Sequence, residues 1–296
     1  MSKKHFILPE VCFEHLTPYG HPESVHRLKA IKSKFLGVLP TPSRSATRDD
    51  ILICHPASYV DLVKSEIENG HTPLSTGDVE IMPKSWNAAL AAVGAALTGI
   101  DLLEEGSRVF AAIRPPGHHA EKARGMGFCL FNNIAIAALY ARKKLNIQRI
   151  LIVDWDLHHG NGTEAIFKDD KHIFYFSTHQ SPLYPGTGLH SNEHILNFPI
   201  HGGKNSRQEV LNAFALLPNA MAKFKPELVL ISAGFDAHKL DPLGALDLET
   251  EDFGLLTRIV KNIANQYSEG RILSLLEGGY NLTALSESAY QHFEEL

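Results

Sequence analysis

A stretch of closely spaced polar residues follows an apolar run near the middle of the 296-residue chain. Residues 150–153 are Ile, Leu, Ile and Val, and residues 154–163 read DWDLHHGNGT. In an extended chain Asp154, Asp156 and His158 point to the same side, because side chains alternate with a period of two. Two carboxylates and an imidazole on one side can bind a divalent cation such as Zn²⁺. The alternative is a polar loop whose aspartate caps the next helix.

Polar segments also follow four other apolar runs. Each run has the composition of a buried strand, and each segment combines glycine or proline with side chains that can act in catalysis. Taken alone, each segment could be an ordinary turn. Because ligands bind at the carboxyl ends of the strands in open α/β sheets, the five segments together predict a single site. The four segments are RPPGHHAEKARGMGF after Ile113, THQSPLYPGTG after Ser177, GFDAHKLDPLG after Ala233 and EGGYN after Leu276.

Strand and helix patterns alternate along the chain, which predicts an α/β fold with a mostly parallel, doubly wound sheet. No linker, repeat or low-complexity segment divides the chain, so we expect one domain over residues 1–296. A Pro/Gly loop without a strand is expected before residue 207. The predicted strands cover residues 6–8, 51–54, 108–113, 150–153, 173–177, 228–233 and 272–276, and the predicted helices cover 23–35, 57–67, 83–105, 132–144, 163–167, 207–223, 249–267 and 283–293.

The composition restricts the class of protein. Hydrophobic residues at 44% and charged residues at 21% are typical of a soluble globular chain. A formal net charge of −5 argues against direct nucleic-acid binding. Three dispersed cysteines without a CxxC pair argue against a disulfide framework and favour a cytoplasmic location. The sequence has neither a signal-peptide pattern nor an apolar run long enough to span a membrane, so no membrane association is expected.

Five motifs together carry a family resemblance: RPPGHHA, DWDLHHGNGTE, YPGTG, SAGFDAHKLDPLG and LEGGYN. In this order and spacing, the chain resembles the zinc-dependent histone deacetylase superfamily from about residue 20 to residue 282. This superfamily includes bacterial acetylpolyamine amidohydrolases and acetoin-utilisation proteins. PPGHH and HHGNG resemble the class II deacetylases and their bacterial relatives, since class I enzymes usually carry an aspartate where Asn161 stands. The resemblance implies a single-domain, arginase-like three-layer fold with the active site at the carboxyl ends of the strands.

The resemblance also implies a metal centre. It makes Asp156, His158 and Asp236 the ligands of one catalytic Zn²⁺, and three protein ligands leave a coordination position open. Such an ion can polarise an amide carbonyl and acidify a bound water. The related ureohydrolases need a second metal with further aspartate and histidine ligands, whereas the DWDLHH and GFD motifs supply one set only.

The predicted catalytic groups surround that metal. By resemblance His118 is backed by Asp154, and His119 by Asn161. A carboxylate raises the basicity of its partner and an amide does not, so the pair is electrostatically unequal. We assign His119 as the general base that activates water and then protonates the leaving amine, and His118 as electrostatic support. Tyr280 matches the family's hydroxyl donor to the oxyanion.

Five residues match the family's acyl-lysine channel. Phe128 and Tyr184 correspond to its aromatic walls, Gly127 to its lining and Leu243 to its rim. For the two aromatic residues, ordinary core packing is the alternative. Asp78 corresponds to the rim aspartate that holds the substrate backbone, and a helix cap is the alternative for this residue.

The resemblance further implies a structural monovalent cation, K⁺. Its ligands would be Asp154, Ser177 and main-chain oxygens at Asp156, His158 and Thr178.

Two residues outside the metal centre remain open to two interpretations. Arg27, in HPESVHRL, resembles the arginine of an internal acetate-release pocket, and a surface helix arginine is the alternative. Cys129 is either a redox-sensitive thiol beside the channel or an inert buried one. Seven histidines fit no motif and are expected to be exposed or structural: His5, His55, His71, His172, His190, His201 and His292.

The sequence therefore predicts a zinc-dependent amidohydrolase that removes acetyl, or longer acyl, groups from an amine. The leading substrate is acyl-lysine in proteins, and the alternative is a small molecule such as an acetylated polyamine. The absence of a long insertion near the motifs weakly disfavours a narrowly gated polyamine site. A third hypothesis is a catalytically silent binding protein that retains the pocket. A monomer or a small homo-oligomer is expected.

Overall fold

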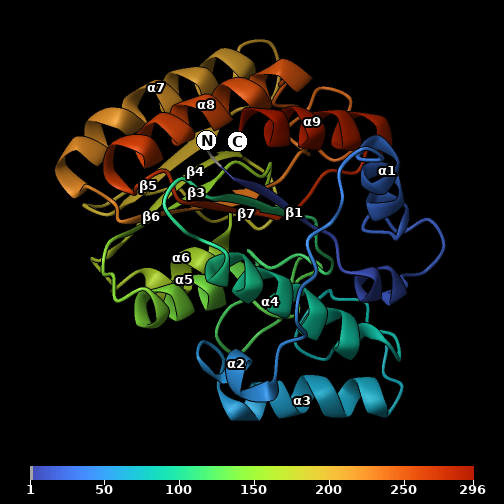
Figure 1. The fold of residues 1–296 in the computed structure, drawn as a ribbon. Coiled ribbons are helices and arrows are strands. Elements are labelled where there is room, and N and C mark those ends of the chain that lie inside the picture. The colour runs from blue at the N-terminus through green and yellow to red at the C-terminus, as the bar shows by residue number, and fades with distance from the viewer. Residues whose placement is uncertain (1–2) are drawn as a thin grey trace.

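The computed structural model describes residues 3–296 as a seven-stranded sheet covered by helices on both faces (Figure 1). The strands run in the order β1-β2-β7-β6-β3-β4-β5, and all pairings between them are parallel. A parallel sheet with both faces covered needs nearly continuous apolar strands, and β3 (Ile150–Asp154) is buried at every position. The other strands are β1 (Lys4–Ile7), β2 (Arg108–Ala111), β4 (Ile173–Gln180), β5 (Ile195–Ile200), β6 (Leu228–Ala233) and β7 (Ile272–Leu276).

The helices form two layers around the sheet (Figure 1). Helices α1 (His26–Lys34), α7 (Ser206–Phe224), α8 (Thr250–Tyr267) and α9 (Leu282–Glu295) cover one face. Helices α4 (Ser85–Asp101), α5 (Asn133–Lys144) and α6 (Asn161–Phe167) cover the other, and α2 (Arg48–Leu52) and α3 (Ala57–Glu68) lie beyond α4. A 3₁₀ helix, η1 (Glu10–Glu14), precedes α1. The predicted three-layer α/β fold is therefore confirmed, and the sheet is fully parallel in the described part of the chain.

A small apolar core joins the outer helices to the main layer. It packs the buried faces of α2 and α3 against α4, apart from the larger core around the sheet. Its buried residues include Ile51, Tyr59, Val60, Val63, Val93, Leu97 and Phe131.

The strand order locates the functional edge of the sheet. From β3 the chain moves outward through β4 to β5, and then returns to place β6 on the other side of β3. Strands β3 and β6 are neighbours, and the chain leaves β3 toward β4 on one side of the sheet and leaves β6 toward β7 on the other side. A crevice at such a reversal is the usual ligand site of an open α/β sheet. The register brings Asp154 at the end of β3 opposite Ser177 of β4 and Ser232 of β6.

The strand predicted over residues 51–54 is wrong, because this region belongs to helix α2 and the turn after it. Thr47 and Asp50 form a capping box, in which the Thr47 side chain accepts from the Asp50 amide and Asp50 accepts from the Thr47 amide at 2.8 Å. This helix-start signal prevailed over the short apolar run. The predicted helices 23–35 and 83–105 are correct in type but begin later and end earlier, as α1 and α4.

Strand β5 was not predicted, because its sequence, ILNFPI, contains an asparagine and a proline within a Pro/Gly-rich region. It pairs only with β4 and lies at the edge of the sheet, where a missing amide donor at Pro199 is tolerated. No helix in residues 3–296 is long and apolar enough to cross a membrane.

Candidate active site

Three predicted metal ligands converge at the crevice between β3 and β6. Asp156, His158 and Asp236 each offer a ligand atom, and these atoms all lie within 4.8 Å of one another. His158 Nδ1 is 3.2 Å from Asp156 Oδ1 and 3.1 Å from Asp236 Oδ2. The backbone holds both carboxylates in place, since Asp156 accepts from the Gly278 amide at 2.7 Å and Asp236 accepts from the Leu157 amide at 2.8 Å. A Cβ on Gly278 would lie 2.2 Å from Asp236 Oδ2, so this approach requires glycine.

The chemistry of this donor set fits a divalent cation. Asp156 and Asp236 are buried, and burial together with the charge of Asp156 raises the pKa of Asp236 to about 7. Burial opposes a charge on His158, but the two carboxylates outweigh it and raise the pKa of His158 to about 10. The cluster thus takes up a proton to balance its buried negative charge. A cation at the centre of two carboxylates and an imidazole would replace that proton, and Zn²⁺ accepts both ligand types.

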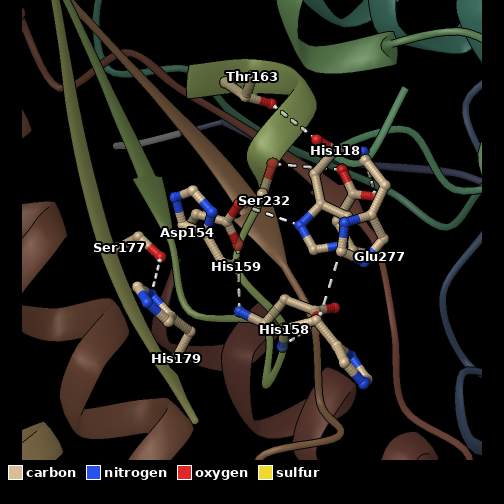
Figure 2. A network of polar contacts seen from close by, with 12 residues as sticks. His118, Asp154, His158, His159, Thr163, Ser177, His179, Ser232 and Glu277 are labelled. Atoms are coloured by element: carbon tan, nitrogen blue, oxygen red, sulfur yellow. Dashed lines mark hydrogen bonds and ion pairs between the residues drawn. The ribbon is translucent and has the colours of Figure 1, made fainter. Parts of the chain in front are cut away.

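The period-two expectation for Asp154 is wrong. Strand β3 ends at this residue, and the chain then turns, so Asp156 and His158 join Asp236 while Asp154 faces the histidine pair. Asp154 Oδ2 lies 3.1 Å from His118 Nδ1, and both residues are labelled in Figure 2. The same oxygen accepts from the Tyr175 hydroxyl at 3.0 Å.

The predicted catalytic histidines stand side by side with unlike surroundings. The ring centroids of His118 and His119 are 4.0 Å apart. Burial disfavours a charged His118, but the carboxylates of Asp156, Asp154 and Glu277 prevail and raise its pKa to about 10. For His119, burial and the positive charges of His118 and His158 lower the pKa well below its usual value. His118 is therefore the charged member and His119 the neutral member of the pair.

Asn161 determines which nitrogen of His119 carries the proton. The Asn161 Nδ2 group donates to the Glu121 carboxylate at 3.1 Å, and a carboxylate can only accept. The amide oxygen consequently faces His119, with Oδ1 at 2.8 Å from Nδ1. His119 must donate from Nδ1, which leaves the lone pair on Nε2 free to accept a proton.

Tyr280 is held at the same edge by the loop after β7. Its amide donates to Asp241 Oδ2 at 2.6 Å, and the Arg27 guanidinium lies 5.1 Å from the centre of its ring. Burial and the charge of Asp236 raise the pKa of the Tyr280 phenol well above its usual value. The hydroxyl therefore remains protonated and can act as a hydrogen-bond donor.

His118, His119, His158 and Tyr280 line one cavity of about 180 Å³. The predicted channel residues are all part of its wall, together with two that were not predicted, Pro116 and Gly278. The Tyr184 ring lies 5.3 Å from His119, and the Phe128 ring lies 6.2 Å from Tyr280. The lining residues are Asp78, Pro116, His118, His119, Gly127, Phe128, His158, Tyr184, Leu243, Gly278 and Tyr280.

Asp78 is part of the cavity wall and does not cap a helix. The N-cap of α4 is Lys84, so the alternative interpretation of Asp78 is wrong. Its Oδ1 atom accepts from the Gly127 amide at 2.8 Å and from the Tyr184 hydroxyl at 3.4 Å. Cys129, next to this turn, is buried, and burial raises the pKa of its thiol well above the usual value. The inert interpretation of this thiol is therefore the one its surroundings support.

Arg27 is fully buried behind Tyr280, so its alternative placement on the surface is wrong. Its guanidinium donates to the carbonyls of Gly279 and Glu277 and to the carboxylate of Glu23 at 3.1 Å. Arg114 also donates to Glu23, at 2.7 Å from Nη2. Burial disfavours a charged Glu23, but the two guanidinium groups outweigh it and lower its pKa to about 2.

Three residues of the predicted potassium site, Asp154, Ser177 and Thr178, are adjacent and buried. Asp154 ends β3 and pairs with Ser177 of the neighbouring strand β4, and Thr178 follows Ser177 in that strand. The Ser177 and His179 side chains point toward one another (Figure 2), with Ser177 Oγ 2.9 Å from His179 Nδ1.

Two buried carboxylates at the site had no role in the sequence prediction. Glu277 accepts from the amides of Gly117 and His118 at 2.7 and 3.1 Å, and from the Ser232 hydroxyl at 3.2 Å. Burial raises the pKa of Glu277 to about 7. Asp241 accepts from the amides of Tyr280 and Leu243. Glu277 directly follows the apolar run of β7, and a carboxylate at that position was a signal in the sequence, whereas Asp241 lies within the motif SAGFDAHKLDPLG without such a signal.

The chain is similar to known proteins over nearly its whole length. Residues 21–296 match the family described as Histone deacetylase domain. Uncharacterized protein slr0245 of Synechocystis sp. is 39% identical over 297 residues, with 95% of each chain covered. Polyamine deacetylase HDAC10 of Danio rerio is 39% identical over 277 residues, which cover 86% of this chain and 40% of that protein. The crystal structure of the HDA15 HD domain superposes with a TM-score of 0.89 at 32% identity, covering 99% of this chain and 87% of the other.

Proposed function

The chain belongs to the histone deacetylase family of amide hydrolases, and on this premise we propose that it is a zinc-dependent deacylase acting on acyl-lysine side chains of proteins. One observation carries the proposal. Asp156, His158 and Asp236 form a cluster suited to Zn²⁺ at a cavity where neutral His119 and protonated Tyr280 also meet.

The chain's own residues would divide the chemistry as follows. A zinc ion held by Asp156, His158 and Asp236 would polarise the amide carbonyl and acidify a water molecule. His119 takes the proton of the attacking water on Nε2 and returns it to the amine nitrogen as the carbon–nitrogen bond breaks. Tyr280 donates a hydrogen bond to the carbonyl oxygen as negative charge develops there.

His118 supplies positive charge beside the reacting groups. Its ion pair with Asp154 favours the imidazolium form, which would stabilise the transition state without exchanging its proton. Glu277 accepts from the backbone amides of Gly117 and His118, and so fixes the loop after β2 that carries both histidines.

The shape and lining of the cavity support a substrate with a slender apolar chain. Phe128, Tyr184 and Leu243 present carbon surfaces to it, which suits the methylene groups of lysine. Asp78 at the wall offers a carboxylate to a peptide amide of the substrate. The same carboxylate could pair with the ammonium group of an acetylated polyamine, and this observation favours that substrate as the second candidate.

We also propose a structural K⁺ bound by Asp154, Ser177 and the main chain at Thr178. His179 Nε2 is 3.1 Å from the Gly188 carbonyl, which can only accept, so Nε2 carries the proton. His179 Nδ1 must then accept from the Ser177 hydroxyl. The Ser177 oxygen thereby keeps its lone pairs for a cation.

A substrate panel tests the proposal. Purified zinc-loaded protein is assayed with acetyl-, longer-acyl- and trifluoroacetyl-lysine peptides and with acetylated polyamines, with Asp236→Ala as the metal-deficient control. We expect release of acyl groups from the lysine peptides with a higher kcat/KM than from the polyamines. The reverse order would support the polyamine alternative, and no release from any acylated amine would refute the deacylase proposal.

A further inference from the structure

Tyr184 stands on a surface loop that has little buried area of its own. Within residues 181–190, which follow β4, only Gly188 is buried, and Tyr184 is 39% exposed. Leu183 packs against the core while partly buried, and the Tyr184 ring lies 5.3 Å from His119. These contacts precede Thr187 and Gly188, so further interactions hold the second half of the loop against the site.

Two buried histidines contact the loop just after Tyr184. His159 follows the predicted zinc ligand His158, and its Nδ1 is 2.7 Å from the Thr187 hydroxyl oxygen. His179, on β4, donates from Nε2 to the Gly188 carbonyl at 3.1 Å. Both imidazoles are 1% exposed, and their ring centroids are 4.7 Å apart. Neither has a role in the proposed chemistry.

The two imidazoles are themselves fixed from the opposite side. His159 Nε2 is 2.9 Å from Glu164 Oε2 on α6, and Asn197 of β5 donates to the same oxygen at 2.6 Å. His179 Nδ1 accepts from Ser177, as Figure 2 shows. Every ring nitrogen of the pair thus has a defined partner, so the rings form a rigid base for the loop.

The loop backbone lies directly on these rings. Gly188 has a φ of +75°, and a Cβ there would be 2.5 Å from His159 Cδ2 and 2.7 Å from His179 Cε1. Only a glycine allows this contact, and the contact explains why Gly188 is the single buried residue of the segment.

We infer that His159 and His179 act as a clamp that positions the channel wall at Tyr184 through Thr187 and Gly188. They are positioning residues: they touch neither the cavity nor the predicted metal ligand atoms, and their effect on substrate passes through the loop. This inference rests on the proposed acyl-lysine channel. It predicts that loosening the clamp weakens substrate binding more than it slows the chemical step.

Thr187 is the residue to change, because it is exposed and belongs to neither the metal cluster nor the cavity wall. Thr187→Val removes the hydroxyl and keeps the shape, whereas Thr187→Ser keeps the hydroxyl. A neutral hydrogen bond of this kind corresponds to roughly a three- to tenfold change in affinity. We expect Thr187→Val to raise KM by about that factor with kcat within about twofold, and Thr187→Ser to restore the KM. Gly188→Ala, which forces the loop off the rings, should raise KM further.

A double-mutant cycle tests whether the effect passes through Tyr184. In a Tyr184→Ala background, Thr187→Val should produce no further rise in KM. An equal rise in both backgrounds would refute the clamp, and so would an unchanged KM in the single variant. Thr98→Val, which removes a threonine hydroxyl bonded to the Gly94 carbonyl of α4, is the matched control and should leave KM unchanged.

Hydrogen exchange of residues 181–190 gives a readout that does not need activity. Thr187→Val should speed exchange in this segment of the zinc-loaded protein, while Thr187→Ser and Thr98→Val should not. Faster exchange in a protein that deacylates no substrate would refute the proposed function and leave the clamp supported. Unchanged exchange would refute the clamp even in an active enzyme.

Discussion

Replacing Asn161 with aspartate changes one charge behind the predicted general base. The Asn161 amide oxygen is 2.8 Å from His119 Nδ1, so Asn161→Asp puts a carboxylate at that distance without altering the side-chain shape. A carboxylate stabilises the imidazolium form, and the pKa of His119 should rise. His119 has to be neutral to accept a proton, so the acidic limb of kcat/KM should move to higher pH.

The environment of His118 indicates how large the pKa shift of His119 should be. Three carboxylates together raise the pKa of His118 from 6.5 to about 10, against the effect of burial. One added carboxylate at hydrogen-bond distance should therefore raise the pKa of His119 by about one to two units. At pH values below the displaced limb, kcat/KM should fall by about tenfold for each unit of the shift, while the plateau at higher pH is retained.

The assay is a pH profile of kcat/KM for wild type and variant with the best acyl-lysine peptide. Glu121 needs a control, because its carboxylate lies 3.1 Å from Asn161 Nδ2 and would repel the new aspartate. In the double variant Glu121→Gln with Asn161→Asp, the glutamine amide can donate a hydrogen bond where the glutamate carboxylate would repel. This variant should show the same displacement of the acidic limb of kcat/KM. An acidic limb that stays where it is, or an activity loss that is equal at every pH, would refute the role of His119.

Four further predictions follow from contacts at or near the site. Tyr280→Phe should retain zinc and substrate affinity but lose about 10²–10³ in kcat, since one oxyanion donor is removed; full activity by steady-state kinetics would contradict its role. Asp236→Ala should lose both metal, by elemental analysis, and activity, and retained stoichiometric zinc would contradict the ligand assignment. Because the pKa of Glu23 is lowered to about 2 from 4.5, its ion pairs stabilise the fold above about pH 4.5 and this contribution is lost as the pH falls toward 2. The difference in Tm between wild type and Glu23→Gln should narrow over that range, and a constant difference would contradict the ion-pair argument. Wild type should melt at a higher temperature in potassium chloride than in choline chloride, and Ser177→Ala should remove this difference; equal melting of wild type in both salts would contradict the potassium site.

Local patterns were sufficient for most of the fold. Strand β3 and helices such as α3 and α5 appear in the sequence as continuous apolar runs or helical periodicity, and the structure has them at or within a few residues of the predicted bounds. The apolar pattern gave a wrong or missing strand at two places. The capping box at Thr47 turned an apolar run into helix α2, and the edge position of β5 tolerated a proline that disfavours a strand elsewhere.

The residue types of the site were likewise visible in the sequence. His118, His119, Asp156, Asp236 and Tyr280 all stand in motifs at the ends of apolar runs, so a site at the carboxyl edge of the sheet could be predicted from them. Spacing alone could not decide which of these groups face one another. It grouped Asp154 with Asp156 and His158, whereas the structure directs Asp154 to the histidine pair.

The family resemblance implied several of those partnerships, but only the tertiary structure gives their physical cause, because they join segments that are far apart in the sequence. The return of the chain from β5 to β6 brings Asp236 to His158, and the position of β7 brings Glu277 to the loop that carries His118. Burial then makes these contacts decide the charge states, because the pKa of a carboxylate or an imidazole that is removed from water is set by the charged and hydrogen-bonding groups nearest to it. The sequence determined which chemical groups are present, and the order of the strands determined which of them lie close together.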